Sequence, residues 1–227
     1  MWKELFQVLS DNNPVEPMTQ ELMQMLEITK EMSSLVHAHV FDQDFGVDQR
    51  AAIYKLDIKV NKLERSIRKR VITHLSISHD HVSYCLLLMS LIKDAERVGD
   101  YLKNISEVPE LGGAEIPDGP LKTELQEIID LAVEMLKTTP DILANEDTER
   151  ATDLLQLGRN TGKRCDVLLV ELAKSNLTAA QTTSMVLLTR FHKRLGAHLL
   201  NILSSVVMPL HKIDFYDGRI SEDPSTN

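Results

Sequence analysis

Two carboxylates four residues apart in the stretch KDAERVGDYLKNISE, residues 93–107, could do chemistry on a cation. Glu96 and Asp100 would share one face of a helix, where like charges repel by about 0.2–0.5 kcal/mol unless a positive group lies between them. A bound metal cation is one way to stabilise such a pair. The other is a basic side chain from the same stretch: Lys93, Arg97 or Lys103.

A second acidic stripe lies upstream, in DIKVNKLE, where Asp57, Asn61 and Glu64 are spaced by four and three residues. If the two helices pack antiparallel, the stripes can face each other and form an oxygen-rich cage for a divalent or trivalent cation. Carboxylates that meet in a helical bundle are an established metal site. The alternative is a solvated face of pairs within one helix: Asp57 with Lys59 or Lys62, and Glu64 with Arg68.

Enzymatic chemistry is not indicated by the sequence. A ferritin-like di-iron protein needs Glu-x-x-His on two helices, and the sequence contains no such motif. Nucleophile elbow, phosphate-binding glycine loop, HExxH and dinucleotide fingerprint are also missing. A metal-dependent hydrolase that uses the same carboxylates is a weaker alternative, because no base or nucleophile is evident.

The composition predicts which elements position these residues. In 227 residues, 43% are hydrophobic and only 4% are aromatic. This is enough apolar surface for a core, and it favours helices over strands, so we expect an all-α protein. The formal net charge of −9 argues against nucleic acid as a partner.

Apolar residues at spacings of three and four predict six long helices after a short N-terminal one. Caps at Thr19, Asp48 and Ser78 would begin the first three helices. The predicted helices cover about 19–40, 48–77, 79–108, 120–143, 147–174 and 178–207. The predicted organisation is an extension at 1–18, a three-helix repeat at 19–108, a linker at 109–119, a second repeat at 120–214 and a disordered tail at 215–227.

The two halves carry related sequences. ERVGDYLKNI at 96–105 and KRLGAHLLNI at 193–202 share Arg, Gly, Leu, Asn and Ile at the same positions. This indicates an internal duplication, and therefore two tandem, pseudo-symmetric three-helix bundles built from six long antiparallel helices. A helical-repeat solenoid is disfavoured by the length of the helices and by the presence of only two copies.

Glycine within a helix costs about 1 kcal/mol relative to alanine, so Gly99 and Gly196 require an offsetting gain. We expect close helix packing at both, either to bring Glu96 and Asp100 near a neighbouring helix or as packing alone. The repeated positions assigned to this packing are Arg97, Gly99, Asn104, Arg194, Gly196 and Asn201.

The stretch ERVGDYLKNISE closely resembles the signature of the PhoU family of bacterial phosphate-uptake regulators. The resemblance implies two tandem three-helix bundles and a site for iron, zinc or another divalent or trivalent metal. The ligands carried over are Glu96 and Asp100, with Asp57, Asn61 and Glu64 facing them. In the second half Lys193 and Ala197 replace the carboxylates, so we expect one metal site at most, with His198 as a candidate substitute ligand.

The resemblance also implies partners. Members of the family act as non-enzymatic regulators of phosphate transport and of phosphate-responsive signalling. The expected partners are a phosphate transporter ATPase or phosphate cotransporter and a membrane sensor histidine kinase, and a homodimer is a further expectation. We therefore expect a cytoplasmic protein that can lie at the inner face of the membrane. The rival is an adaptor of the same fold that serves another transporter or pathway.

Overall fold

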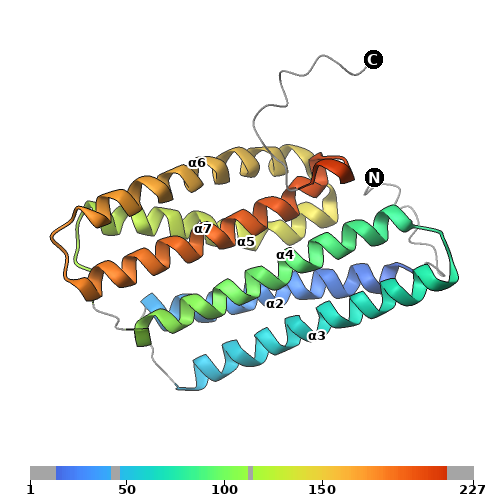
Figure 1. Cartoon of the computed structure of the whole chain (residues 1–227), viewed down its shortest axis with the longest axis horizontal. Helices are drawn as coiled ribbons and strands as arrows, with labels where there is room; N and C mark the ends of the chain where they lie inside the picture. Colours follow the sequence, from blue (N-terminus) through green and yellow to red (C-terminus); the bar gives the residue numbers. More distant parts are fainter. Residues whose placement is uncertain (1–13, 42–46, 112–114, 214–227) are drawn as a thin grey trace, which may run out of the picture.

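The computed structural model describes residues 14–41, 47–111 and 115–213. In these ranges the chain forms six long α-helices and two short 3₁₀ turns (Figure 1). The helices are α2 (Glu16–Phe41), α3 (Val47–Ile77), α4 (Val82–Glu107), α5 (Pro120–Asn145), α6 (Thr148–Ala173) and α7 (Ala179–Val207). The predicted tail at 215–227 and most of the predicted extension at 1–18 lie outside the described residues.

Helices α2, α3 and α4 pack as one antiparallel bundle, and α5, α6 and α7 pack as a second (Figure 1). The two bundles meet mainly where α4 lies along α7, and α2 also contacts α5. The predicted fold class, all-α with two tandem three-helix bundles, is confirmed. Each half buries apolar faces at three and four spacings, which is the pattern expected of bundle helices.

Local chemistry fixes the starts of the last two helices within a residue of their predicted positions. The carboxylate of Asp147 accepts a hydrogen bond from the Arg150 amide at 3.0 Å and caps α6. Thr178 and Gln181 form a reciprocal capping box before α7. These caps satisfy amides that the first turn of a helix leaves without a partner. Pro209 follows the end of α7, as predicted.

The predicted start of the first helix at Thr19 is wrong, because α2 begins at Glu16. Pro17 fits in the first turn, where its fixed φ is helical and its missing N–H is not needed. Thr19 is instead buried inside the helix. Its hydroxyl donates to the Val15 carbonyl at 3.2 Å and also bonds to the Tyr84 hydroxyl.

The third helix also begins later than predicted, at Val82. Ser78 does not cap it, because its hydroxyl bonds to Asp80, donating to the carboxylate at 2.8 Å and accepting from the amide at 3.0 Å. His81 then takes a left-handed conformation, with φ of 58°, directly before the helix. The turn between α3 and α4 is therefore held by its own side chains rather than by a helix cap.

Packing at the glycines differs from the prediction. A Cβ at Gly99 would lie 3.7 Å from Val60 Cγ1, an ordinary contact, and one at Gly196 would meet nothing within 4 Å. The prediction of close packing at Gly196 is therefore wrong. Among the described glycines, Gly158 in α6 has the tightest surroundings: a Cβ there would lie 2.6 Å from Leu200 Cδ2, so the Leu200 side chain would have to shift. Here the absence of a side chain lets α6 approach α7 closely.

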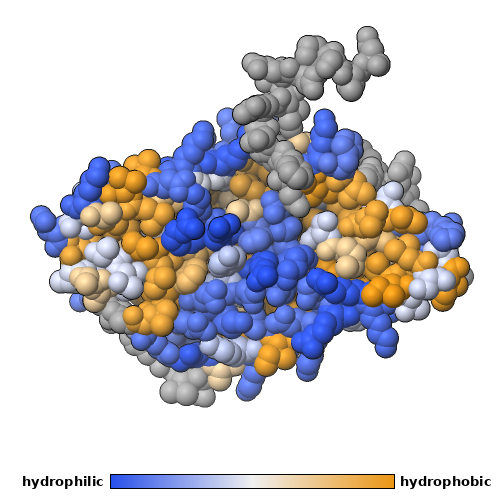
Figure 2. All heavy atoms as spheres, viewed as in Figure 1, coloured by the Kyte–Doolittle hydropathy of each residue, from blue (hydrophilic) through white to orange (hydrophobic). Residues whose placement is uncertain are grey.

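The surface is mixed. Hydrophilic side chains cross the middle of the face shown in Figure 2, between areas of hydrophobic side chains toward both ends. Across residues 14–41, 47–111 and 115–213, no helix has an apolar stretch sufficient to cross a bilayer.

Candidate functional site

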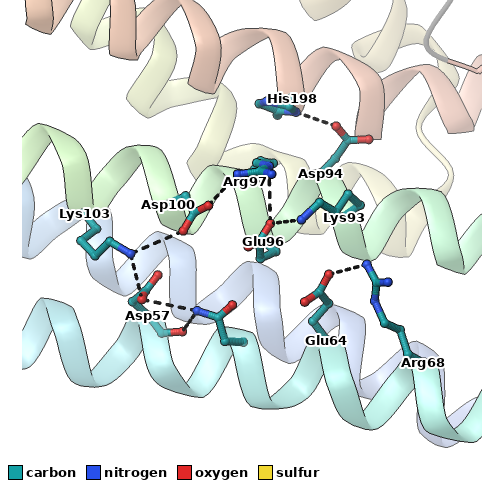
Figure 3. Close-up of polar contacts among 11 residues, drawn as sticks. Asp57, Glu64, Arg68, Lys93, Asp94, Glu96, Arg97, Asp100, Lys103 and His198 are labelled. Carbon is teal, nitrogen blue, oxygen red and sulfur yellow. Dashed lines mark hydrogen bonds and ion pairs between the residues drawn. The ribbon is translucent and has the colours of Figure 1, made fainter.

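The antiparallel packing of α3 and α4 brings the two acidic stripes together on one face of the first bundle (Figure 3). Asp57 and Glu64 come from α3, and Glu96 and Asp100 come from α4. Their side chains are 10–12% exposed, except that of Asp100, which is 24% exposed. We call these four residues the acidic cluster. Carboxylates this far removed from water need positive partners.

Lys103 lies between the two stripes. Its Nζ is 3.2 Å from Asp57 Oδ2 and 3.5 Å from Asp100 Oδ1 (Figure 3). Burial lowers the pKa of Lys103, but the hydrogen bond to Asp57 and the charges of Asp57 and Asp100 outweigh burial, so the net pKa is raised. A raised pKa keeps the amine protonated. An ammonium group therefore occupies the position between Asp57 and Asp100 where the sequence predicted a metal.

The other carboxylates of the acidic cluster also have basic partners. Lys93 Nζ lies 2.7 Å from Glu96 Oε2, and Arg68 Nη2 lies 2.7 Å from Glu64 Oε1. Arg97 lies between two carboxylates of the acidic cluster. Its Nη1 is 3.0 Å from Asp100 Oδ2, and its Nε is 3.7 Å from Glu96 Oε2. The pair of Glu64 with Arg68 is the one expected if the stripe were a solvated face.

Asn61 supports Asp57. Its amide nitrogen donates to the Asp57 backbone carbonyl at 3.0 Å and approaches Asp57 Oδ2 at 3.4 Å. In this arrangement the Asn61 side chain orients the carboxylate and neutralises no charge.

As arranged, these residues do not fit a metal ion. Among the described residues no group of three or more His, Cys, Asp or Glu side chains converges on one point. A metal between Asp57 and Asp100 would have to displace the ammonium of Lys103, because two cations cannot share that space. The metal site at Asp57, Asn61, Glu64, Glu96 and Asp100 stays a prediction.

The second half is built differently at the corresponding positions. Lys193, which replaces Glu96, pairs with Asp166 of α6, and Ala197, which replaces Asp100, is exposed. His198 does not lie among carboxylates of the second half. Its Nδ1 is 2.7 Å from Oδ1 of Asp94, on α4 of the first half. The role of His198 as a substitute metal ligand stays a prediction.

Sequence reasoning missed Asp94, which links the two halves of the chain. It is buried, and its Oδ1 accepts hydrogen bonds from both His198 Nδ1 and Asn201 Nδ2, the latter at 3.0 Å. Tyr101 stacks on the His198 ring with centroids 5.7 Å apart. Asn201, assigned to packing, therefore bonds across the two halves. The only sequence signal was an acidic residue on the apolar side of α4.

The remaining positions of the repeated pattern do not share one role. Arg97 forms ion pairs on the surface of the acidic cluster, whereas Arg194 is exposed on α7. Asn104 is half-buried on α4. The repeated letters therefore mark equivalent places in the two bundles, with the chemistry preserved only in part.

Together, the fold and the site define a class: an all-helical protein of two tandem three-helix bundles, with a charged helical face on the first. The PhoU domain model matches residues 22–108, which span the three helices that build the acidic cluster. Residues 22–108 are thus similar to the PhoU domain, and the resemblance to the PhoU family is confirmed over these residues.

A curated relative and two solved structures support this. The chain is 29% identical over 86 residues to a "Phosphate-specific transport system accessory protein PhoU homolog" of Deinococcus radiodurans; the match spans 38% of this chain and 39% of the relative. PhoU from Pseudomonas aeruginosa has a TM-score of 0.74 at 20% identity, covering 86% of this chain and 95% of its own. The phosphate transport system regulatory protein PhoU from Streptococcus pneumoniae has a TM-score of 0.73 at 17% identity, with coverages of 85% and 93%. At these identities the structures show the fold.

Proposed function

We propose that this protein regulates phosphate transport without catalysing a reaction, by binding a component of a phosphate transport system. The observation that carries the proposal is the match of residues 22–108 to the PhoU domain model, within a chain of which 86% superimposes on a PhoU structure. The relatives are described as an accessory and a regulatory protein of phosphate transport.

The first partner we propose is the ATPase of a phosphate transporter, at the cytoplasmic face of the membrane. A sensor histidine kinase, a phosphate cotransporter and a second copy of this chain are further candidates. Exposed apolar side chains near the turn between α3 and α4 offer a contact surface, since apolar clusters on a protein surface often mark partner sites. They are Ile72, Ile77, Val82 and Leu86, with exposures of 64%, 83%, 39% and 52%.

The test is binding of the purified protein to the phosphate transporter ATPase from its own host, measured by calorimetry. We expect binding to the wild-type protein and at least tenfold weaker binding to Ile77→Glu/Leu86→Glu, because charges would prevent burial of this surface. The matched control is Val167→Glu/Val170→Glu on α6, where the apolar side chains are 58% and 52% exposed. This control should bind like wild type.

The outcome also separates the proposal from its rival. Binding to the phosphate transporter ATPase, together with altered phosphate uptake in a strain lacking the protein, supports regulation of phosphate transport. Preference for the ATPase of an unrelated transporter, with normal phosphate uptake, would support an adaptor for another pathway.

We further propose that Lys103 competes with metal at the acidic cluster. Lys103→Ala removes the ammonium from between Asp57 and Asp100 and leaves two carboxylate oxygens free to accept a divalent cation. The affinity for Zn²⁺ should rise by about tenfold or more, because the carboxylates of Asp57 and Asp100 repel each other once the ammonium group of Lys103 is gone. Calorimetric titration with Zn²⁺ and elemental analysis of the purified variant measure this.

Two controls make the result specific. Lys122→Ala removes an exposed lysine that pairs with Asp118 and should leave Zn²⁺ affinity unchanged. Adding Asp57→Asn and Asp100→Asn to Lys103→Ala should abolish the gain. Equal Zn²⁺ affinity in the wild type and in Lys103→Ala would show that the lysine does not guard a metal site.

A further inference from the structure

The second bundle contains a cavity of about 290 Å³ between α5, α6 and α7. Its apolar wall is formed by Ile128, Met135 and Leu200. A cavity of this size is close to the lower end of the range for small-molecule sites, and it is larger than a few water molecules require. The second bundle therefore has room for a small organic molecule with an apolar part.

Two glycines keep this space open. Gly162 of α6 and Gly196 of α7 both line the cavity, and a Cβ at either would meet no neighbouring atom within 4 Å. Glycine in a helix interior destabilises the helix relative to alanine. Packing does not require glycine at these two positions, whereas a Cβ at Gly158, on the same wall, would force the side chain of Leu200 to shift. The structure thus leaves empty space over two helix positions where larger side chains would fit.

The charged residues of the wall are all basic. The described residues that line the cavity include Arg159, Arg190, Lys193 and Arg194, and they include no aspartate or glutamate. Lys193 is partly neutralised by its pair with Asp166. Arg190 and Arg194 form no ion pair within the described part of the chain, and both are exposed. Guanidinium groups bind phosphate and carboxylate oxygens in a bidentate manner.

In the repeated sequence pattern, part of this wall corresponds to the acidic cluster of the first half. Lys193 and Ala197 stand where the first half has Glu96 and Asp100, and both line the cavity. Lys193 in place of Glu96 therefore reverses the sign of the charge, and Ala197 in place of Asp100 removes most of the volume of a side chain. In the first half, Glu96 and Asp100 are both paired with basic residues.

We propose that the cavity binds a small organic anion, with its apolar body against Ile128, Met135 and Leu200 and its anionic group at Arg190 and Arg194. Both parts of the wall are used by such a molecule, whereas inorganic phosphate would leave the apolar part unoccupied and a neutral apolar molecule would leave the arginines unused. This binding site is separate from the partner surface near the turn between α3 and α4.

The experiment is titration of the full chain with phenyl phosphate, phenol and inorganic phosphate, followed by calorimetry and by amide NMR shifts. Phenyl phosphate should bind at least tenfold more tightly than either phenol or inorganic phosphate. The largest amide shifts should fall at residues 158–162 and 190–197. No binding of phenyl phosphate, or equal binding of inorganic phosphate, would overturn the proposal.

Variants locate the site. Gly196→Leu should fill the cavity and weaken phenyl phosphate binding at least tenfold, while its thermal unfolding temperature stays at or above that of wild type. Gly162→Leu is the second filling variant if the first does not fold. Arg190→Gln/Arg194→Gln should weaken phenyl phosphate but not phenol. Ala144→Leu, at an exposed position of α5, is the control and should bind as wild type does. Unchanged binding in both filling variants would place the ligand elsewhere and disprove the assignment.

Discussion

Lowering the pH from 7.5 to 5 should cost the folded protein about 2 kcal/mol of stability through one buried residue, His192. This side chain of α7 is 6% exposed, and burial lowers its pKa from 6.5 to about 4. A hydrogen bond of its Nδ1 to the Leu188 carbonyl, at 2.8 Å, opposes the shift, and the charge of His37 adds to it. The unfolded chain takes up a proton below pH 6.5, whereas the folded chain does so only near pH 4. Stability is therefore full above pH 6.5 and falls as the pH drops toward 4.

Urea unfolding at pH 7.5, 6 and 5 measures this effect. His192→Leu removes the titrating group and should flatten the pH dependence by about 2 kcal/mol over this range. His79→Leu, at an exposed position before α4, is the matched control and should keep the wild-type slope. If His192→Leu and wild type lose stability in parallel, another group is responsible for the acid sensitivity.

Asp94→Ala should destabilise the protein by about 3 kcal/mol, because it removes the shared acceptor of two hydrogen bonds between the halves. His198 and Asn201 would then face a cavity without their partner. Since the side chain of Asp94 is only 10% exposed, water replaces these bonds poorly. Urea unfolding of Asp94→Ala, His198→Ala and the double variant measures both the total effect and the coupling, which should be about 1–2 kcal/mol.

The control for Asp94 is Asp130→Ala. Asp130 is exposed on α5 and accepts one hydrogen bond from Gln126 at 2.8 Å. This substitution should change stability by less than about 0.5 kcal/mol. If Asp94→Ala and Asp130→Ala lose the same stability, the hydrogen bonds of Asp94 between α4 and α7 contribute no more than those of an exposed carboxylate.

The helices could be predicted because their signals are local. Periodic apolar residues and turn residues lie within one segment, so α5, α6 and α7 begin within a residue of the predicted positions. Thr19 misled the prediction because its hydroxyl has a tertiary partner, Tyr84, 65 residues away. A side chain of the type that caps helices also serves well inside a bundle when it finds such a partner.

The site could be predicted only in part. Spacing within α3 and α4 correctly brought Asp57 and Asp100 to one face, and Lys103 was among the basic residues named as possible partners. Spacing could not choose between a lysine and a metal, because that choice depends on the direction of one flexible side chain. The partner of His198 is Asp94, 104 residues away on a helix of the other repeat, and no pattern within one segment indicates such a contact.

The position of α4 has a consequence for how the molecule comes apart. This helix packs on α2 and α3 within its own bundle and on α7 of the other, while α2 also touches α5. Loss of α4 would expose the apolar faces of both repeats at once, so neither repeat keeps a complete core of its own. We therefore expect the two bundles to unfold as one cooperative unit, with few local openings that leave one bundle intact.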